Sequence, residues 1–191
     1  MLVGHNLKVF DFPRLLTALR AVNLEIRFQH VCFGGIDSLH VMREIHPGML
    51  CYKQGHLFKT LMNGEYSAHN AINDVLSLQK LFEKSQVPLE ISCKFSFATE
   101  WGFQCLTFKD MTEANATTMD CLSRNRILSK QMLNKIASSG LQYQHLLAVF
   151  QREGRSGLVQ LLSEKYCGVA SVTSCKKGLD ALFEHFKSVQ V

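Results

Sequence analysis

The sequence contains little proline and no long apolar run. Only 3 of its 191 residues are proline and 47% are hydrophobic, a composition that predicts a globular chain rather than a disordered one. Charged residues interrupt every apolar run well below the length of a membrane span, so we expect no membrane partner. The first residues have neither a basic segment nor a cleavage site, which argues against secretion.

Paired cysteines are also lacking. The seven cysteines are an odd number, are scattered along the chain and form no CxxC pair. This pattern is typical of reduced thiols in an intracellular protein, either nuclear or cytoplasmic.

The positive charge is concentrated in the last third of the chain. Lys and Arg outnumber Asp and Glu by nine to four in residues 125–191, against nine to seven in residues 1–87, and the net charge is +5. Such a bias is compatible with contact to a phosphate backbone, although many basic helical faces are simply solvated. Lys176 and Lys177 are the candidates for this contact, and a solvated rim is the alternative.

The hydrophobic pattern of the first 87 residues alternates strands and helices. It predicts strands over 2–5 and 30–39 and helices from Phe10, over 52–63 and over 68–85. Gly34 and Gly35 mark a bulge or a close approach in the second strand. This order is typical of a piece of an α/β sheet protein.

The rest of the chain reads differently. Alternating apolar residues predict one strand or a hairpin within 89–108, and residues 111–123 read as a linker. Four helices follow, near 125–138, 142–152, 155–164 and 175–188, with glycines at or near the breaks. We therefore expect three segments: a partial α/β domain (1–87), a connecting segment (88–124) and a small all-α domain (125–191).

Three polar residues of the first segment could carry chemistry. Asp11 follows a strand at the start of a helix, where ligands bind in open α/β sheets. Asp74 is a hard oxygen ligand suited to Mg²⁺ or Mn²⁺, and a neutral His69 could act as a general base. The alternatives are a plain helix-start residue for Asp11, a partly exposed helix-start histidine for His69 and a solvated surface charge for Asp74. Asp37, after Gly-Gly-Ile, reads as a turn or cap residue.

Two motifs resemble those of the DEDDh family of 3′–5′ exonucleases. The first matches His-Asn-x-x-x-Phe-Asp-x-x-x-Leu at His5, Asn6, Phe10, Asp11 and Leu15. The second matches Ala-His-x-Ala-x-x-Asp-Val at Ala68, His69, Ala71, Asp74 and Val75. The resemblance covers about residues 1–86.

That resemblance implies a ribonuclease H-like fold and two-metal phosphodiester hydrolysis with Mg²⁺ or Mn²⁺. Asp11 and Asp74 would be metal ligands and His69 the general base, and we assign His5 and Asn6 to nucleic-acid binding. The family's Asp-x-Glu motif and its first strands are missing from the sequence. We therefore expect a truncated fold and a pseudoenzyme with little or no activity, and the alternative is a fragment of an active exonuclease.

The tail has a narrower resemblance. The tail contains SSGLQYQHLLAVFQREGRSGLVQLLSEK, followed by KKGLDALFEHF. It is similar to the C-terminal region of the long isoform of promyelocytic leukaemia protein and its vertebrate relatives. This implies a nuclear binding or scaffold module, with DNA or RNA as partners and with protein partners of the helical tail. Five apolar residues of the tail are either its core or an interface: Leu146, Phe150, Leu158, Leu161 and Leu162.

Overall fold

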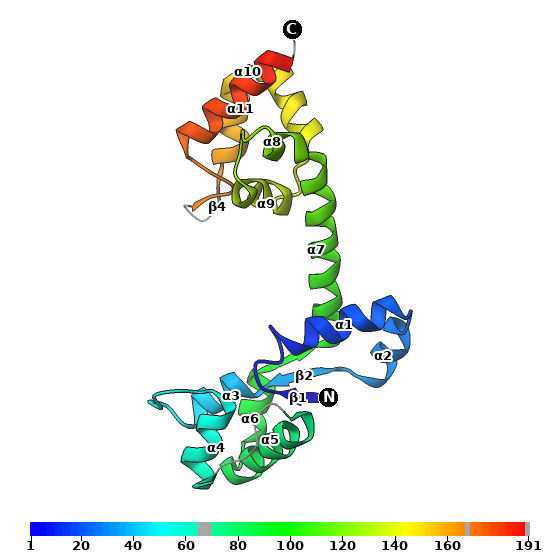
Figure 1. The fold of residues 1–191 in the computed structure, drawn as a ribbon, viewed down its shortest axis with the longest axis vertical. Helices are drawn as coiled ribbons and strands as arrows, with labels where there is room; N and C mark the ends of the chain where they lie inside the picture. Colours follow the sequence, from blue (N-terminus) through cyan, green and yellow to red (C-terminus); the bar gives the residue numbers. More distant parts are fainter. Residues whose placement is uncertain (65–69, 167–168, 190–191) are drawn as a thin grey trace. The chain divides into compact units, whose positions relative to one another are not determined.

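The chain folds into two compact units that consist mostly of helices. The computed structural model describes residues 1–64, 70–166 and 169–189. Met1–Leu106 form unit 1 and Thr107–Val191 form unit 2 (Figure 1). In the described part of the chain, no helix is both long and apolar enough to cross a membrane.

Unit 1 surrounds a small sheet with short helices. Its elements are β1 (Leu2–Gly4), α1 (Asp11–Ala21), α2 (Glu25–Val31), β2 (Gly34–Asp37), α3 (Ser38–Ile45), α4 (Gln54–Met62), α5 (Ala71–Ser85), α6 (Leu89–Lys94), β3 (Ser96–Ala98) and the first part of α7 (Thr99–Thr118). The predicted helices from Phe10, over 52–63 and over 68–85 are confirmed as α1, α4 and α5.

The sheet of unit 1 has the strand order β1-β2-β3. β1 runs parallel to β2, with Leu2 opposite Gly35, and β2 runs antiparallel to β3. The predicted close approach at the Gly-Gly pair is confirmed, because a Cβ atom on Gly34 would collide with the carbonyl oxygen of Phe97.

Two apolar clusters hold unit 1 together. In the first, the fully buried Phe12 and Leu16 of α1 pack with Phe97 of β3 and Phe103 of α7. The Phe12 and Phe97 rings meet edge to face, with 4.9 Å between their centroids. The second cluster joins α3, α4 and α5 through Met42, Leu57, Phe58 and Leu81.

Unit 2 packs its helices around one larger core. Its elements are the end of α7, α8 (Asp120–Arg124), α9 (Lys130–Ser138), α10 (Tyr143–Ser163), the two-residue strands β4 (Lys165–Tyr166) and β5 (Val169–Ala170), and α11 (Lys176–Val189). Leu146, Leu158 and Leu162 are at most 1% exposed. The predicted tail residues therefore form the core of this unit, and Gly154 breaks α10 at the expected place.

The expected partial ribonuclease H-like α/β fold is wrong. The described sheet of unit 1 has only three strands of three or four residues each. Helices form most of the chain instead, and two of them, α2 and α3, fall in segments that the strand-based reading did not include. α3 buries Val41 and Met42 on one face. The architecture is mainly helical, with a small mixed sheet in unit 1.

The strand or hairpin and the linker expected for residues 88–124 are also wrong for most of this segment. Only Ser96–Ala98 form a strand, while α6, α7 and α8 occupy most of the rest. α7 shows no single apolar stripe, because Phe103 and Leu106 pack into the core of unit 1 whereas Ala116 packs against that of unit 2. A helix that serves two cores lacks the periodicity by which amphipathic helices are recognised.

Candidate functional site

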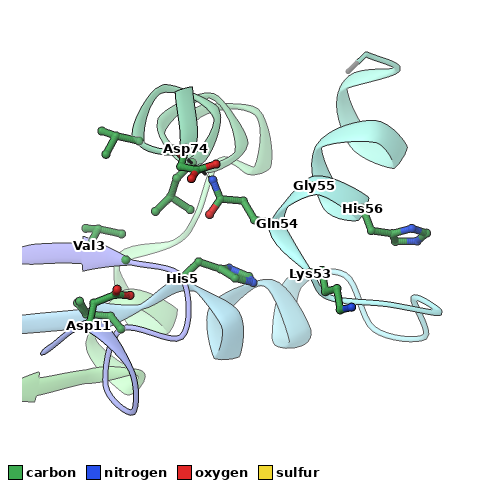
Figure 2. A pocket seen from close by; sticks show the side chains of 12 residues that line it. Val3, His5, Asp11, Lys53, Gln54, Gly55, His56 and Asp74 are labelled. Carbon is green, nitrogen blue, oxygen red and sulfur yellow. Dashed lines mark hydrogen bonds between the residues drawn. The ribbon is translucent and has the colours of Figure 1, made fainter. Parts of the chain in front are cut away.

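A pocket in unit 1 brings the two predicted metal-binding aspartates together. The cavity has a volume of about 670 Å³. Asp11, from the first turn of α1, and Asp74, from the first turn of α5, line it from separate walls (Figure 2). The structure therefore joins two carboxylates that lie far apart in the sequence, next to the end of β1.

A buried carboxylate shapes the turn that leads from β1 to Asp11. Asp37 is 1% exposed and accepts hydrogen bonds from the backbone N–H groups of Asn6 (3.0 Å), Lys8 (3.0 Å) and Leu39 (3.1 Å). The bond from Leu39 makes Asp37 the N-cap of α3, as predicted. The other two bonds hold the 5–10 turn, in which Asn6 has a φ of 61°.

His5 lines the pocket, and both of its ring nitrogens make hydrogen bonds. Its Nε2 is 2.7 Å from the carbonyl oxygen of Tyr52, and its Nδ1 is 3.0 Å from Oγ of Ser38. In the neutral imidazole, Nε2–H donates to the carbonyl oxygen of Tyr52 and Nδ1 accepts from the hydroxyl of Ser38. Burial lowers the pKa of His5, an effect that the Tyr52 carbonyl and Asp37 oppose.

Gln54 fixes the position of the second aspartate. Its side-chain amide donates to the carbonyl oxygen of Asp74 and to Oγ of the buried Ser77, both at 2.6 Å. These bonds tie the first turn of α4 to that of α5. They hold the backbone of Asp74, whose side chain lines the pocket (Figure 2).

The described residues of the pocket do not complete a metal site. No group of three His, Cys, Asp or Glu side chains suited to a metal ion occurs in residues 1–64, 70–166 and 169–189. Asp11 and Asp74 supply two carboxylates, fewer than a two-metal centre requires. His69, the predicted general base, lies outside the described residues.

The remaining predicted site residues fall in two places. Asn6 lines a second cavity of about 470 Å³, which also contains His5, Lys53 and Gln54. Lys176 and Lys177 are exposed in the first turn of α11 in unit 2. Their assignment to nucleic-acid binding stays a prediction.

Sequence reasoning missed the polar residues at the start of α4. Lys53, Gln54 and His56 all line the first pocket, and the His56 side chain points away from the two carboxylates (Figure 2). The available signal was a run of polar residues around Gly55 at a helix start, but it does not reveal which distant segment the helix faces.

Comparison with known proteins gives two similarities. Residues 115–189 match the family model described as "PML, C-terminal domain". The chain is also 30% identical over 125 residues to the chloroplastic/mitochondrial exonuclease DPD1 of Arabidopsis thaliana. That match covers 61% of this chain and 36% of the exonuclease.

The chain thus spans about a third of the length of this exonuclease. The comparisons show a partial similarity to an exonuclease and a similarity of residues 115–189 to the PML C-terminal domain. No solved structure matches the chain significantly.

Proposed function

We propose that unit 1 binds the end of a single-stranded nucleic acid without efficient hydrolysis, within a nuclear scaffold protein of the promyelocytic leukaemia type. The observation that carries the proposal is the shared pocket of Asp11 and Asp74. The similarities to an exonuclease and to the PML C-terminal domain support it. Weak hydrolysis is expected because two carboxylates hold two divalent ions poorly.

Lys53 is the pocket residue best suited to meet a phosphate. It is exposed at the N-cap position of α4 and lines both cavities. Its positive charge would offset the repulsion between a phosphodiester and the two carboxylates. Phosphate contacts of this kind weaken with added salt.

Fluorescence anisotropy with a labelled single-stranded oligonucleotide tests the proposal. We expect salt-dependent binding that weakens about tenfold in Lys53→Ala. Lys80→Ala is the matched control, because Lys80 is an exposed lysine of α5 outside the pocket lining. Equal affinities of the two variants would overturn the assignment of the pocket.

A second candidate is a fragment of an active Mg²⁺- or Mn²⁺-dependent 3′–5′ exonuclease, which the similarity to an organellar exonuclease favours. The same oligonucleotide, incubated with either ion and separated on a denaturing gel, distinguishes the two. Persistence of the full-length strand supports the binding module. Stepwise shortening that is lost in Asp74→Asn would establish the exonuclease instead.

A further inference from the structure

One long stretch of unit 2 carries positive charge only. Between Asp120 and Glu153 the sequence has five Lys and Arg residues and no Asp or Glu. The stretch includes most of α8, all of α9 and the first part of α10. A surface with one sign of charge over this length creates a potential that attracts anions.

Four of these five cations have no side-chain partner among the described residues, and three of them lie at or next to the α8–α9 loop. Arg124, Arg126 and Lys130 are exposed, and their side chains make no hydrogen bond or ion pair with any other described residue. In contrast, Arg152 pairs with Glu153 at 2.6 Å and Arg155 pairs with Asp180. The cations of the α8–α9 loop are thus available to an external ligand.

Tertiary packing adds two lysines to this loop. Leu128 lies between Arg126 and Lys130 in the sequence, and its Cδ2 is 3.7 Å from the position of a Cβ atom built on Gly178. Gly178 directly follows the Lys pair of α11. We group the exposed cations of the loop and of the neighbouring first turn of α11 under the name basic patch: Arg124, Arg126, Lys130, Lys176 and Lys177.

The stability of unit 2 does not explain the basic patch. The lysine pair lies in the first turn of α11, where the helix dipole disfavours positive charge. Arg126 has a φ of 56°, a conformation in which Gly or Asn is less strained. Like charges held together at a cost to the fold indicate a function in binding.

The chemistry of the basic patch favours a duplex over other polyanions. The exposed large apolar residues among those described in unit 2 are Phe108, Met111 and Val189, and none belongs to the patch. A protein interface needs a buried apolar centre, and single-strand binding relies on exposed aromatic rings for stacking. The phosphate backbone of a duplex requires only cations and polar donors.

We propose that the basic patch of unit 2 binds the phosphate backbone of a nucleic-acid duplex. This inference rests on the proposed function only in taking nucleic acid as the ligand. It concerns unit 2 and a duplex, whereas the proposed function concerns the pocket of unit 1 and a single strand. The patch would hold a duplex through about five phosphate contacts, one for each cation.

The test measures the affinity of the full chain for a labelled DNA duplex as a function of salt concentration. Arg126→Ala/Lys130→Ala and Lys176→Ala/Lys177→Ala remove two charges each from the patch. Lys165→Ala/Lys187→Ala is the matched control, because it removes the same charge from exposed positions of the same unit. Circular dichroism checks that all three variants are folded.

We expect each patch variant to weaken duplex binding about tenfold and to reduce the slope of log K against log salt by about 2, since each phosphate contact contributes about 0.9. The control variant should leave both the duplex affinity and the salt slope nearly unchanged. Equal losses in patch and control variants would overturn the proposal, because net charge alone would then explain binding. Tighter binding of poly-glutamate than of the duplex would overturn the choice of ligand.

The Lys53→Ala variant separates this result from the proposed function. It should leave duplex affinity unchanged while weakening single-strand binding. A different result is that the patch variants lose single-strand binding while Lys53→Ala affects neither ligand. This result would refute the assignment of the pocket and leave the assignment of the patch intact. An intact single-strand response without any duplex binding would refute the patch alone.

Discussion

Replacing Asp37 by Asn should destabilise unit 1 strongly, although the two side chains have the same shape. The Asp37 carboxylate is buried and accepts backbone N–H groups at both oxygens. Asn can keep the two bonds to Oδ1 but turns its amide N–H₂ toward the N–H of Lys8. A lost charge-assisted bond costs about 1.5–3 kcal/mol and an unsatisfied donor adds to it. We expect a loss of about 3 kcal/mol in the free energy of unfolding.

Urea unfolding followed by tryptophan fluorescence measures this loss. The single tryptophan of the chain, Trp101, belongs to unit 1, where the Phe97 ring lies 5.5 Å away and Lys8 Nζ lies 4.4 Å above it. Asp11→Asn is the matched control, because Asp11 is exposed and its loss should cost less than about 1 kcal/mol. Similar losses in both variants would refute the role given to Asp37.

Three further predictions concern the stability of the two units. Unit 1 should lose stability as the pH falls below about 6.5, because His5 is protonated in the unfolded chain while burial keeps its pKa lower in the folded chain. The free energy of unfolding stops falling once the pH is below the pKa of folded His5. Urea titrations at several pH values should show a smaller loss in His5→Gln. Gly102→Ala should destabilise unit 1 by about 1 kcal/mol, because the added Cβ would lie 2.5 Å from Leu16 Cδ1 and overpacking exceeds the gain in helix propensity. In Gly55→Ala the added Cβ meets open space, so this variant should be about 0.5–1 kcal/mol more stable. Thermal melts in which both variants shift the melting temperature in the same direction would contradict the packing around Gly102. Leu182→Ala should destabilise unit 2 by about 2–5 kcal/mol, since Leu182 is fully buried in its core; a melt by circular dichroism that matches the unchanged chain would show that the core is wrongly assigned.

Local interactions made several features of this chain predictable. The apolar stripes of α1, α4 and α5 appear in the sequence at helical spacing, and Gly154 predicts the break in α10, where its φ is 60°. Asp37 reads as a cap because its side chain bonds a backbone N–H two residues on. Each of these features depends on neighbours within a few turns, so the sequence alone carries the signal.

The site was only partly predictable. The motif around Asp11 and the motif around Asp74 each suggested a ligand, but only packing shows that they line one pocket with Lys53 and Gln54. His5 was assigned to nucleic acid, whereas its ring nitrogens meet Ser38 and Tyr52. Hydrogen bonds between distant segments leave no periodic trace in the sequence, which is why these partners were not foreseen.

The sequence by itself therefore determined the positions of α1, α4, α5 and the tail helices α9 to α11, the candidate acids and the basic character of the tail. Tertiary structure decided that residues 99–118 are a helix, because two separate cores supply the burial that its uneven apolar pattern does not announce. It also decided that Leu128 and Gly178 lie side by side, which brings the start of α11 next to the loop that carries Arg124, Arg126 and Lys130. Helical propensity acts between neighbours in the chain, whereas pockets and charged surfaces arise from contacts between residues that only folding brings together.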